Sequence, residues 1–241
     1  MLDGRRPVPL DIAEKLDLKF SENMFMVSGS NVPMKIPKKL DGDLAYLVGV
    51  LRDGTVAREG NNEYLCAFYN KDKEFVEIVR KVAEKTFYVK TKIEKMDEVW
   101  GIRMRSLNLY LFFTLLFEIP KKQEFWKTPE IIETADKELQ REYVSGFWDA
   151  EGTCSRIEKF SKISSKNTYI GFNQKNKESL LFIKDVLEKE NIRTGDVYWN
   201  GHVWVLKIAT GSITRFARYM KSKHPKKSKR LVKIGNIFSS N

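Results

Sequence analysis

The sequence REYVSGFWDAEG, residues 141–152, is the stretch that decides the fold, and a weaker copy, LAYLVGVLRDG, precedes it at residues 44–54. Each copy is an apolar run of helical spacing that ends in an acidic residue followed by a glycine. Each also has an inner glycine, Gly49 or Gly146, which leaves room for another backbone to approach closely. Two such runs in one chain predict two helices that pack against each other.

The acidic residues Asp53 and Glu151 fall at the predicted C-termini of these helices, directly before Gly54 and Gly152. A carboxylate there meets the negative end of the helix dipole, which costs about 0.3–1 kcal/mol at an exposed site. A divalent metal between the two carboxylates would remove this penalty and their mutual repulsion. A single Asp-Gly or Glu-Gly is an ordinary helix stop, but the duplication favours the metal site.

The segment VSGFWDAEG, residues 144–152, resembles the nine-residue signature of the LAGLIDADG homing endonucleases position for position, with Glu151 at the metal-binding acid. The segment LVGVLRDG, residues 47–54, resembles the other copy but is one residue shorter between its glycine and its acid. The resemblance covers about residues 41–231. It implies a monomer, of intron-encoded or free-standing origin, that cuts both strands of a long asymmetric DNA site with Mg²⁺ or Mn²⁺.

The resemblance also implies roles for individual side chains. Asp53 and Glu151 would bind the metal, and basic and amide side chains at the end of the second strand of each half would surround it. The matching positions here are Asn70, Lys71, Gln174 and Lys175. For each lysine taken alone, a surface charge beside a helix is the slightly more ordinary interpretation.

The composition agrees with a nucleic-acid partner and excludes several other classes. The 241 residues include 43 Lys and Arg against 32 Asp and Glu, which gives a net charge of +11 and a pI near 9.4. The two cysteines lack CxxC spacing, and the two histidines are far apart, which argues against zinc sites and Ser or Cys–His catalysis. No apolar run is long enough for a membrane span, so we expect a soluble, intracellular protein in the cytoplasm.

An internal duplication sets the predicted domain organisation. NKDKE at residues 70–74 matches QKNKE at 174–178, and VWGI at 99–102 matches VWVL at 203–206, both at one constant offset along the chain. We therefore predict an α+β fold with two pseudo-symmetric α-β-β-α-β-β-α halves packed through the two signature helices. The predicted parts are an N-terminal extension (1–40), a first half (41–120), a linker (121–137) and a second half with a basic tail (138–241).

Periodicity and turn residues place the elements within these parts. In the extension we expect a helix at 10–16 and a hairpin around 24–30, and a short turn after the first signature helix. The predicted strands are 64–70, 87–94, 99–105, 153–157, 169–174, 197–199 and 203–209. The other predicted helices are 72–85, 107–117, 176–189 and 213–220.

Strand alternation predicts a basic sheet face. If Trp100 and Ile102 face the helices, Arg103 faces away from them, and the same argument applies to the other strands. A basic β surface of this kind, shaped as a saddle, can lie in the major groove of double-stranded DNA, although a solvated face is common in antiparallel sheets. The predicted DNA-contacting residues are Tyr69, Lys90, Lys92, Arg103, Arg105, Tyr169, Asn173 and Lys207.

The shortened first copy leaves a second function open. One missing helical residue rotates the chain beyond it by about 100° and shortens the rise by about 1.5 Å, unless the last turn tightens to 3₁₀ geometry. The alternative is therefore a DNA-binding protein of the same fold with impaired or absent cleavage: a relic, a regulator or an intron-splicing helper. Intein splicing is not expected, because the chain begins with Met1 and lacks a His-Asn end.

Overall fold

The computed structural model describes residues 24–26, 33–59, 63–120, 122–155 and 169–239. The chain divides into two compact units, of which the first contains residues up to Leu44 and again Asp53–Lys121. The second contains Ala45–Arg52 and the chain from Lys122 onward. The division falls inside the first signature helix, α2 (Gly42–Val50), whose last residues cluster with the second unit.

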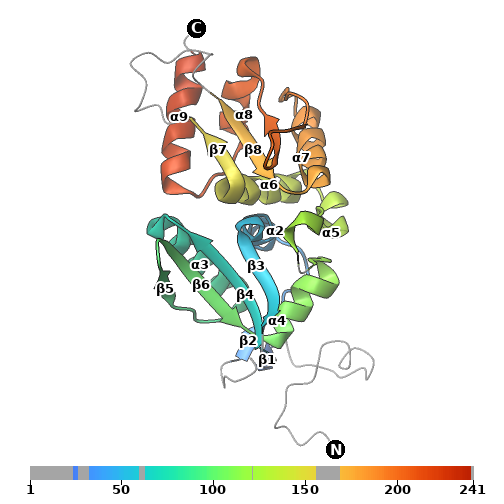
Figure 1. The fold of residues 1–241 in the computed structure, drawn as a ribbon, viewed down its shortest axis with the longest axis vertical. Helices are drawn as coiled ribbons and strands as arrows, with labels where there is room; N and C mark the ends of the chain where they lie inside the picture. Colours follow the sequence, from blue (N-terminus) through green and yellow to red (C-terminus); the bar gives the residue numbers. More distant parts are fainter. Residues whose placement is uncertain (1–23, 27–32, 60–62, 121, 156–168, 240–241) are drawn as a thin grey trace, which may run out of the picture. The chain divides into compact units, whose positions relative to one another are not determined.

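The first unit is built on a four-stranded antiparallel sheet in the order β3-β4-β6-β5 (Figure 1). Its strands are β3 (Gly54–Glu59), β4 (Glu63–Asn70), β5 (Ile93–Met96) and β6 (Val99–Arg105). Helix α3 (Lys73–Phe87) packs on β4 and β6, with Phe75 edge-on to Phe68 at 5.5 Å between ring centroids. On the central rung, Cys66 of β4 pairs with Val56 and Met104, and all three are buried.

Two further elements complete the first unit. Helix α4 (Leu107–Leu111) continues as a π-helical turn at Phe112–Leu116. The phenylalanine rings of this segment pack edge to face with the ring of Phe87 at the end of α3. Strands β1 (Met24–Met26) and β2 (Pro33–Lys35) form a separate antiparallel pair.

The second unit repeats the same sheet topology, in the order β7-β8-β10-β9. Its strands are β7 (Gly152–Cys154), β8 (Ile170–Gln174), β9 (Tyr198–Trp199) and β10 (Trp204–Lys207). Its helices are α5 (Glu130–Glu133), the second signature helix α6 (Lys137–Glu151), α7 (Lys177–Lys189), α8 (Ile213–Tyr219) and α9 (Pro225–Ser239). The predictions of an α+β fold and of two similar halves are confirmed.

Side-chain caps explain where the helices begin. Asp72 accepts the backbone N–H of Glu74 before α3, and Asn176 accepts that of Ser179 before α7. Before α6, Asp136 accepts the N–H of Leu139 at 2.9 Å. The two caps before α3 and α7 lie in the matching segments NKDKE and QKNKE. The internal repeat therefore includes the residue that begins the corresponding helix in each half.

Several elements differ from the predictions. Strand β3 lies where a short turn was expected. The sequence did not predict this strand because Val56 is its one fully buried apolar side chain among the described positions. The strand predicted at 87–94 was wrong: α3 continues to Phe87, Tyr88 ends it in the left-handed region at φ 56°, and β5 begins only at Ile93. The predicted hairpin has its second strand at 33–35 and not within 24–30, and the helix predicted at 10–16 lies outside the described residues.

The basic tail also folds, as α9. Leu231 and Ile234 are buried, and this helix packs mainly on α8. Gly235 allows the close contact, because a Cβ there would lie 2.9 Å from the Cβ of Ala217. The spacing of Leu231 and Ile234 was a helical signal that the surrounding lysines obscured.

Candidate active site

The two signature helices meet at their inner glycines, as the sequence predicted. A Cβ on Gly49 of α2 would overlap the carbonyl oxygen of Tyr143 and lie 2.6 Å from the backbone nitrogen of Phe147. A Cβ on Gly146 of α6 would likewise overlap the carbonyl oxygen of Tyr46. Because backbone contacts backbone here, no larger residue fits at either position without a shift of the helices.

Helix α2 does tighten at its end. It gives way after Val50 to a 3₁₀ turn at Leu51–Asp53, whereas α6 continues as an α-helix to Glu151. Three 3₁₀ residues rise about 6 Å, as four α-helical residues do, and they rotate the chain by about 360° where four α-helical residues rotate it by about 400°. The tighter turn therefore recovers the missing rise and leaves a rotation of about 40°.

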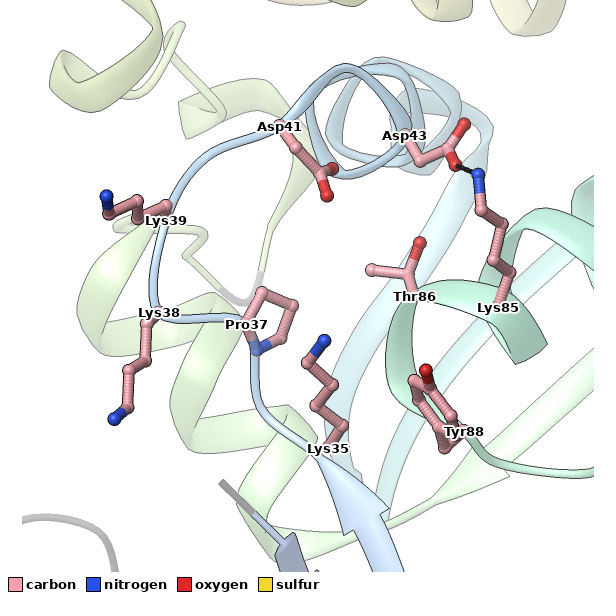
Figure 2. Close-up of a pocket in the computed structure, with 9 residues that line it drawn as sticks. All are labelled: Lys35, Pro37, Lys38, Lys39, Asp41, Asp43, Lys85, Thr86 and Tyr88. Carbon is pink, nitrogen blue, oxygen red and sulfur yellow. Dashed lines mark hydrogen bonds and ion pairs between the residues drawn. The ribbon is translucent and has the colours of Figure 1, made fainter. Parts of the chain in front are cut away.

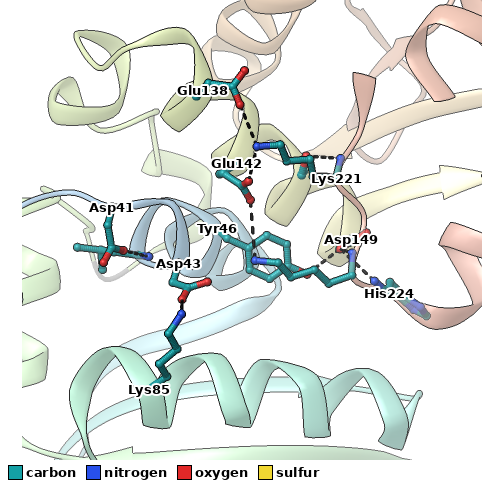
Figure 3. A network of polar contacts seen from close by, with 12 residues as sticks. Asp41, Asp43, Tyr46, Lys85, Glu138, Glu142, Asp149, Lys221 and His224 are labelled. Atoms are coloured by element: carbon teal, nitrogen blue, oxygen red, sulfur yellow. Dashed lines mark hydrogen bonds and ion pairs between the residues drawn. The ribbon is translucent and has the colours of Figure 1, made fainter. Parts of the chain in front are cut away.

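A buried carboxylate, Asp149, organises the end of α6 (Figure 3). It accepts hydrogen bonds from the hydroxyls of Tyr46 at 2.6 Å and Ser222 at 2.5 Å. It also accepts the backbone N–H groups of Lys223 at 2.7 Å and His224 at 3.1 Å. Burial raises the pKa of Asp149 and these donors oppose the rise, while burial and the nearby carboxylate raise the pKa of Tyr46 well above its ordinary value.

The residues 221–227, which we call the return segment, hold α6 with their lysines as well. The Nζ of Lys221 lies 2.9 Å from Glu138 and 2.8 Å from Glu142 (Figure 3). The Nζ of Lys227 donates to the carbonyl oxygens of Trp148 at 2.9 Å, Asp149 at 2.8 Å and Ala150 at 3.4 Å. A cation at this end of the helix offsets the negative end of its dipole, directly before Glu151.

In the first copy, an arginine, Arg52, occupies the position that corresponds to Asp149. The buried Arg52 donates to the carbonyl oxygens of Trp126 and Lys127 and, at 2.7 Å, to the hydroxyl of Tyr143. Its guanidinium also lies 5.5 Å from the ring centre of Phe147. The sequence alone did not lead us to Arg52, Tyr46, Asp149 or Lys227. The signal for the first three was their fixed spacing from the two inner glycines.

The other predicted site residues lie at comparable places in the two units. Asn70 ends β4, where its side chain accepts the N–H of Asp72 at 2.9 Å, and Gln174 ends β8, where its side chain accepts the N–H of Lys175 at 2.7 Å. Gln174 is buried, and within the described part of the chain its Nε2 has no hydrogen-bond partner. Lys71 and Lys175 are exposed. Asp53 and Glu151 are both half-buried, each followed by the glycine that starts a strand.

The two sheets have one face toward the helices and one face with basic and tyrosine side chains. On the helix side, Lys73 lies over Trp100 at 4.5 Å and Lys177 over Trp204 at 4.9 Å. On the other face of the first sheet, Arg103 donates to the hydroxyl of Tyr69 at 3.3 Å.

The second sheet has a similar arrangement on its outer face. Lys207 lies over the rings of Tyr169 and Tyr198 at 6.0 and 5.5 Å.

The remaining predicted DNA-contacting residues differ in their positions. Asn173 is half-buried on β8, and Arg105 is exposed at the end of β6. Lys90 and Lys92 are exposed but lie between α3 and β5, so strand alternation no longer supports their predicted role.

A pocket of about 370 Å³ in the first unit contains none of the predicted site residues (Figure 2). Lysines and aspartates line it together, and Lys85 pairs with Asp43 at 2.6 Å. Asp41 accepts the N–H of Leu44 at 2.8 Å and so caps α2. Lys85 and both aspartates of this pocket are therefore engaged within the fold.

The described residues contain no group of three or more His, Cys, Asp and Glu side chains that could hold a metal ion. A metal at Asp53 or Glu151 would need further oxygen ligands such as backbone carbonyls, water or a substrate phosphate. None of the helices described here has the length and apolar character required to cross a membrane.

Comparison with known proteins defines the class. A family profile described as a LAGLIDADG-like domain matches residues 138–221. Homing endonuclease I-ApeI of Aeropyrum pernix is 35% identical over 199 residues, which are 79% of this chain and 86% of that protein. The chain belongs to the LAGLIDADG homing endonuclease family, as the signature predicted.

Solved structures agree with this assignment at the level of the fold. I-DmoI in complex with DNA and Ca superposes with a TM-score of 0.58 at 21% identity, covering 79% of this chain and 97% of that one. I-DmoI with DNA and Mn gives a TM-score of 0.57 at 21% identity, covering 77% and 99%. I-WcaI bound to its DNA recognition sequence gives 0.54 at 14% identity, covering 81% and 88%.

Proposed function

We propose that this protein is a monomeric, site-specific endonuclease that hydrolyses both strands of a long asymmetric DNA site in a divalent-metal-dependent reaction. The observation that carries the proposal is the pair of glycine-packed helices that each end in a carboxylate, Asp53 and Glu151. Its similarity to homing endonuclease I-ApeI supports this activity, and the crystallisation of I-DmoI with DNA and Ca or Mn supports a divalent metal.

The donor set fits a hard cation such as Mg²⁺ or Mn²⁺. Asp53 and Glu151 offer carboxylate oxygens, which these ions prefer. Lys227 covers the carbonyl groups behind Glu151, so the helix dipole opposes a carboxylate there less than it otherwise would. When bound, the metal would activate water, neutralise charge on the phosphate and stabilise the leaving oxygen.

The chain's own residues would position the substrate around these acids. The buried amide of Gln174 has donor groups that can orient a water molecule, and the exposed ammonium groups of Lys71 and Lys175 can offset charge on a phosphate. Asn70 holds the corner between β4 and α3. One acid comes from each half, which matches a substrate with two antiparallel strands.

The basic sheet faces would bind the DNA. Arg103 lies beside the ring of Tyr69, and Lys207 lies beside the rings of Tyr169 and Tyr198. Such cations contact phosphates or guanine edges. We propose that Tyr69 and Arg105 contact DNA together with Arg103, and that Tyr169 and Asn173 do so together with Lys207. Lys90 and Lys92 lie between α3 and β5 and are assigned to neither sheet face.

Replacing the second-copy acid tests the reaction. Incubation with a plasmid library and Mg²⁺ or Mn²⁺ should select a site that the protein cuts on both strands. Glu151→Gln keeps the size of the side chain but removes its charge, so we expect a loss of cleavage of at least about 100-fold with DNA affinity retained. Lys81→Gln, an exposed position on α3, is the control and should cut normally.

The same experiment distinguishes the nuclease from the alternative, a DNA-binding protein that does not cleave. A protein that binds a selected site tightly but cuts neither strand with either metal would contradict the nuclease proposal. It would instead favour a DNA-binding relic, regulator or splicing helper. Cleavage that survives Glu151→Gln would contradict the assignment of this residue.

A further inference from the structure

Two tyrosines and two charged residues are arranged symmetrically around the helix contact. Tyr46 and Tyr143 each precede the inner glycine of their helix by three residues, and Arg52 and Asp149 each follow it by three. The hydroxyl of Tyr46 donates to Asp149 at 2.6 Å, and Arg52 donates to the hydroxyl of Tyr143 at 2.7 Å. Each tyrosine thus reaches the charged residue of the opposite helix.

The two charged residues have opposite signs and bind opposite backbone groups. Asp149 accepts N–H groups from Lys223 and His224 in the return segment. Arg52 donates to the carbonyl groups of Trp126 and Lys127 in the linker. The same position therefore ties one helix to the return segment and the other helix to the linker.

Each tie lies directly beside a proposed metal-binding acid. Arg52 is the middle residue of the 3₁₀ turn that ends at Asp53, and the side chain of Gln123 in the linker donates to its carbonyl oxygen at 3.4 Å. Because both the side chain and the backbone of Arg52 are held, the turn has little freedom to unwind. The second acid, Glu151, is instead supported by Asp149 and Lys227.

We infer that Arg52 is a positioning residue that fixes the Asp53 carboxylate through the linker, separately from the Asp149–Lys227 contacts that fix Glu151. This inference rests on the proposed function, in which the acid of each half serves the site. Since the two supports share no residue, weakening one should misplace one acid and leave the other in place. Cleavage of the two DNA strands should then become unequal.

The experiment measures the two strand cleavages separately. A selected target duplex labelled differently on each strand is incubated with Mg²⁺ and resolved on a denaturing gel. Arg52→Lys keeps the charge but cannot reach three acceptors at once. We expect it to slow one strand about 10- to 100-fold more than the other, so that nicked duplex accumulates, because losses of supporting contacts have effects of this size.

A reciprocal variant and a binding measurement sharpen the test. Lys227→Met should slow the opposite strand, while the Kd for DNA in Ca²⁺ stays close to that of the unmodified protein. Titration of Mn²⁺ into the complex with pre-cleaved duplex should show weakened binding of the metal in both variants. Lys81→Gln should change none of these quantities.

The outcomes distinguish this inference from the proposed function. If the unmodified protein cuts but Arg52→Lys slows both strands equally, with a lowered melting temperature, Arg52 is merely structural and the inference is overturned. If Arg52→Lys does not fold, Tyr143→Phe removes one hydroxyl from the same tie and should slow the same strand by a smaller factor; equal slowing would again overturn the inference. Absence of cutting by the unmodified protein contradicts the proposed function itself.

Discussion

At the residue scale, the two inner glycines meet a strict steric requirement. A Cβ on Gly49 or Gly146 would overlap a carbonyl oxygen of the facing helix, and backbone cannot move aside as a flexible side chain can. We expect Gly49→Ala to lower the free energy of unfolding by about 1–3 kcal/mol, the usual effect of overpacking. Urea denaturation followed by circular dichroism measures this.

The matched control for this substitution is Gly211→Ala. A Cβ at Gly211 meets no atom within 4 Å, so the change should leave stability unaltered or raise it by about 0.4–1 kcal/mol through the unfolded state. Equal destabilisation by both substitutions would mean that the helices do not approach as closely as described.

The sequence predicts the two acids of the site better than it predicts the residues that hold these acids in position. Asp53 and Glu151 stand out because each ends an apolar helical run before a glycine. The sequence does not predict the roles of Arg52 and Asp149, because their partners are distant along the chain. No local pattern indicates the contact between Asp149 and the return segment. Their equal spacing from the glycines becomes meaningful only once the helices are seen in contact.

At the scale of elements, the helix caps in the repeated segments offer a direct test. Asn176→Ala removes the acceptor for the N–H of Ser179 and should lower the free energy of unfolding by about 1 kcal/mol. Asn176→Asp keeps the acceptor but loses the Nδ2 donor to the carbonyl oxygen of Glu124 at 3.0 Å, so it should retain only the part of the stability that the cap supplies. Thermal or urea unfolding of the two variants decides this, and equal losses would show that the cap contributes nothing.

Local sequence predicts those elements that carry several regularly spaced apolar residues. Strand β6 and helix α7 are where the pattern placed them. Strand β3 was missed, because its identity as a strand comes from its ladder with β4 and not from its own residues. The segment 88–92 resembles a strand in composition, but α3 extends past its expected end and takes up the preceding residues.

At the scale of the whole molecule, the net charge of +11 predicts a strong dependence of DNA binding on salt. The logarithm of the affinity should fall linearly with the logarithm of salt concentration, with a slope of about −0.9 per phosphate contact. Arg103→Gln and Lys207→Gln should each reduce this slope by about 1 if the side chain binds a phosphate. Fluorescence anisotropy at several salt concentrations measures the slopes.

Lys81→Gln is again the comparison, because this lysine is exposed on α3 and not on the sheet face. It removes the same formal charge, so any effect of net charge alone appears in it. A slope that falls equally in all three variants would contradict a specific role for the sheet faces.

The grouping of Ala45–Arg52 with the second unit bears on how this gene could be divided for split-protein experiments. A cut in the linker would leave the C-terminal fragment with Gly146 facing no helix, and Asp149 would lose the hydroxyl of Tyr46. That fragment would lack Ala45–Arg52, the eight residues that belong to its unit but lie on the N-terminal fragment. It would be complete only when the N-terminal fragment binds to it in trans. Reassembly of the two fragments would then report on the helix contact together with the contacts of Arg52 to Tyr143 and the linker, which makes this set of contacts usable as a complementation device.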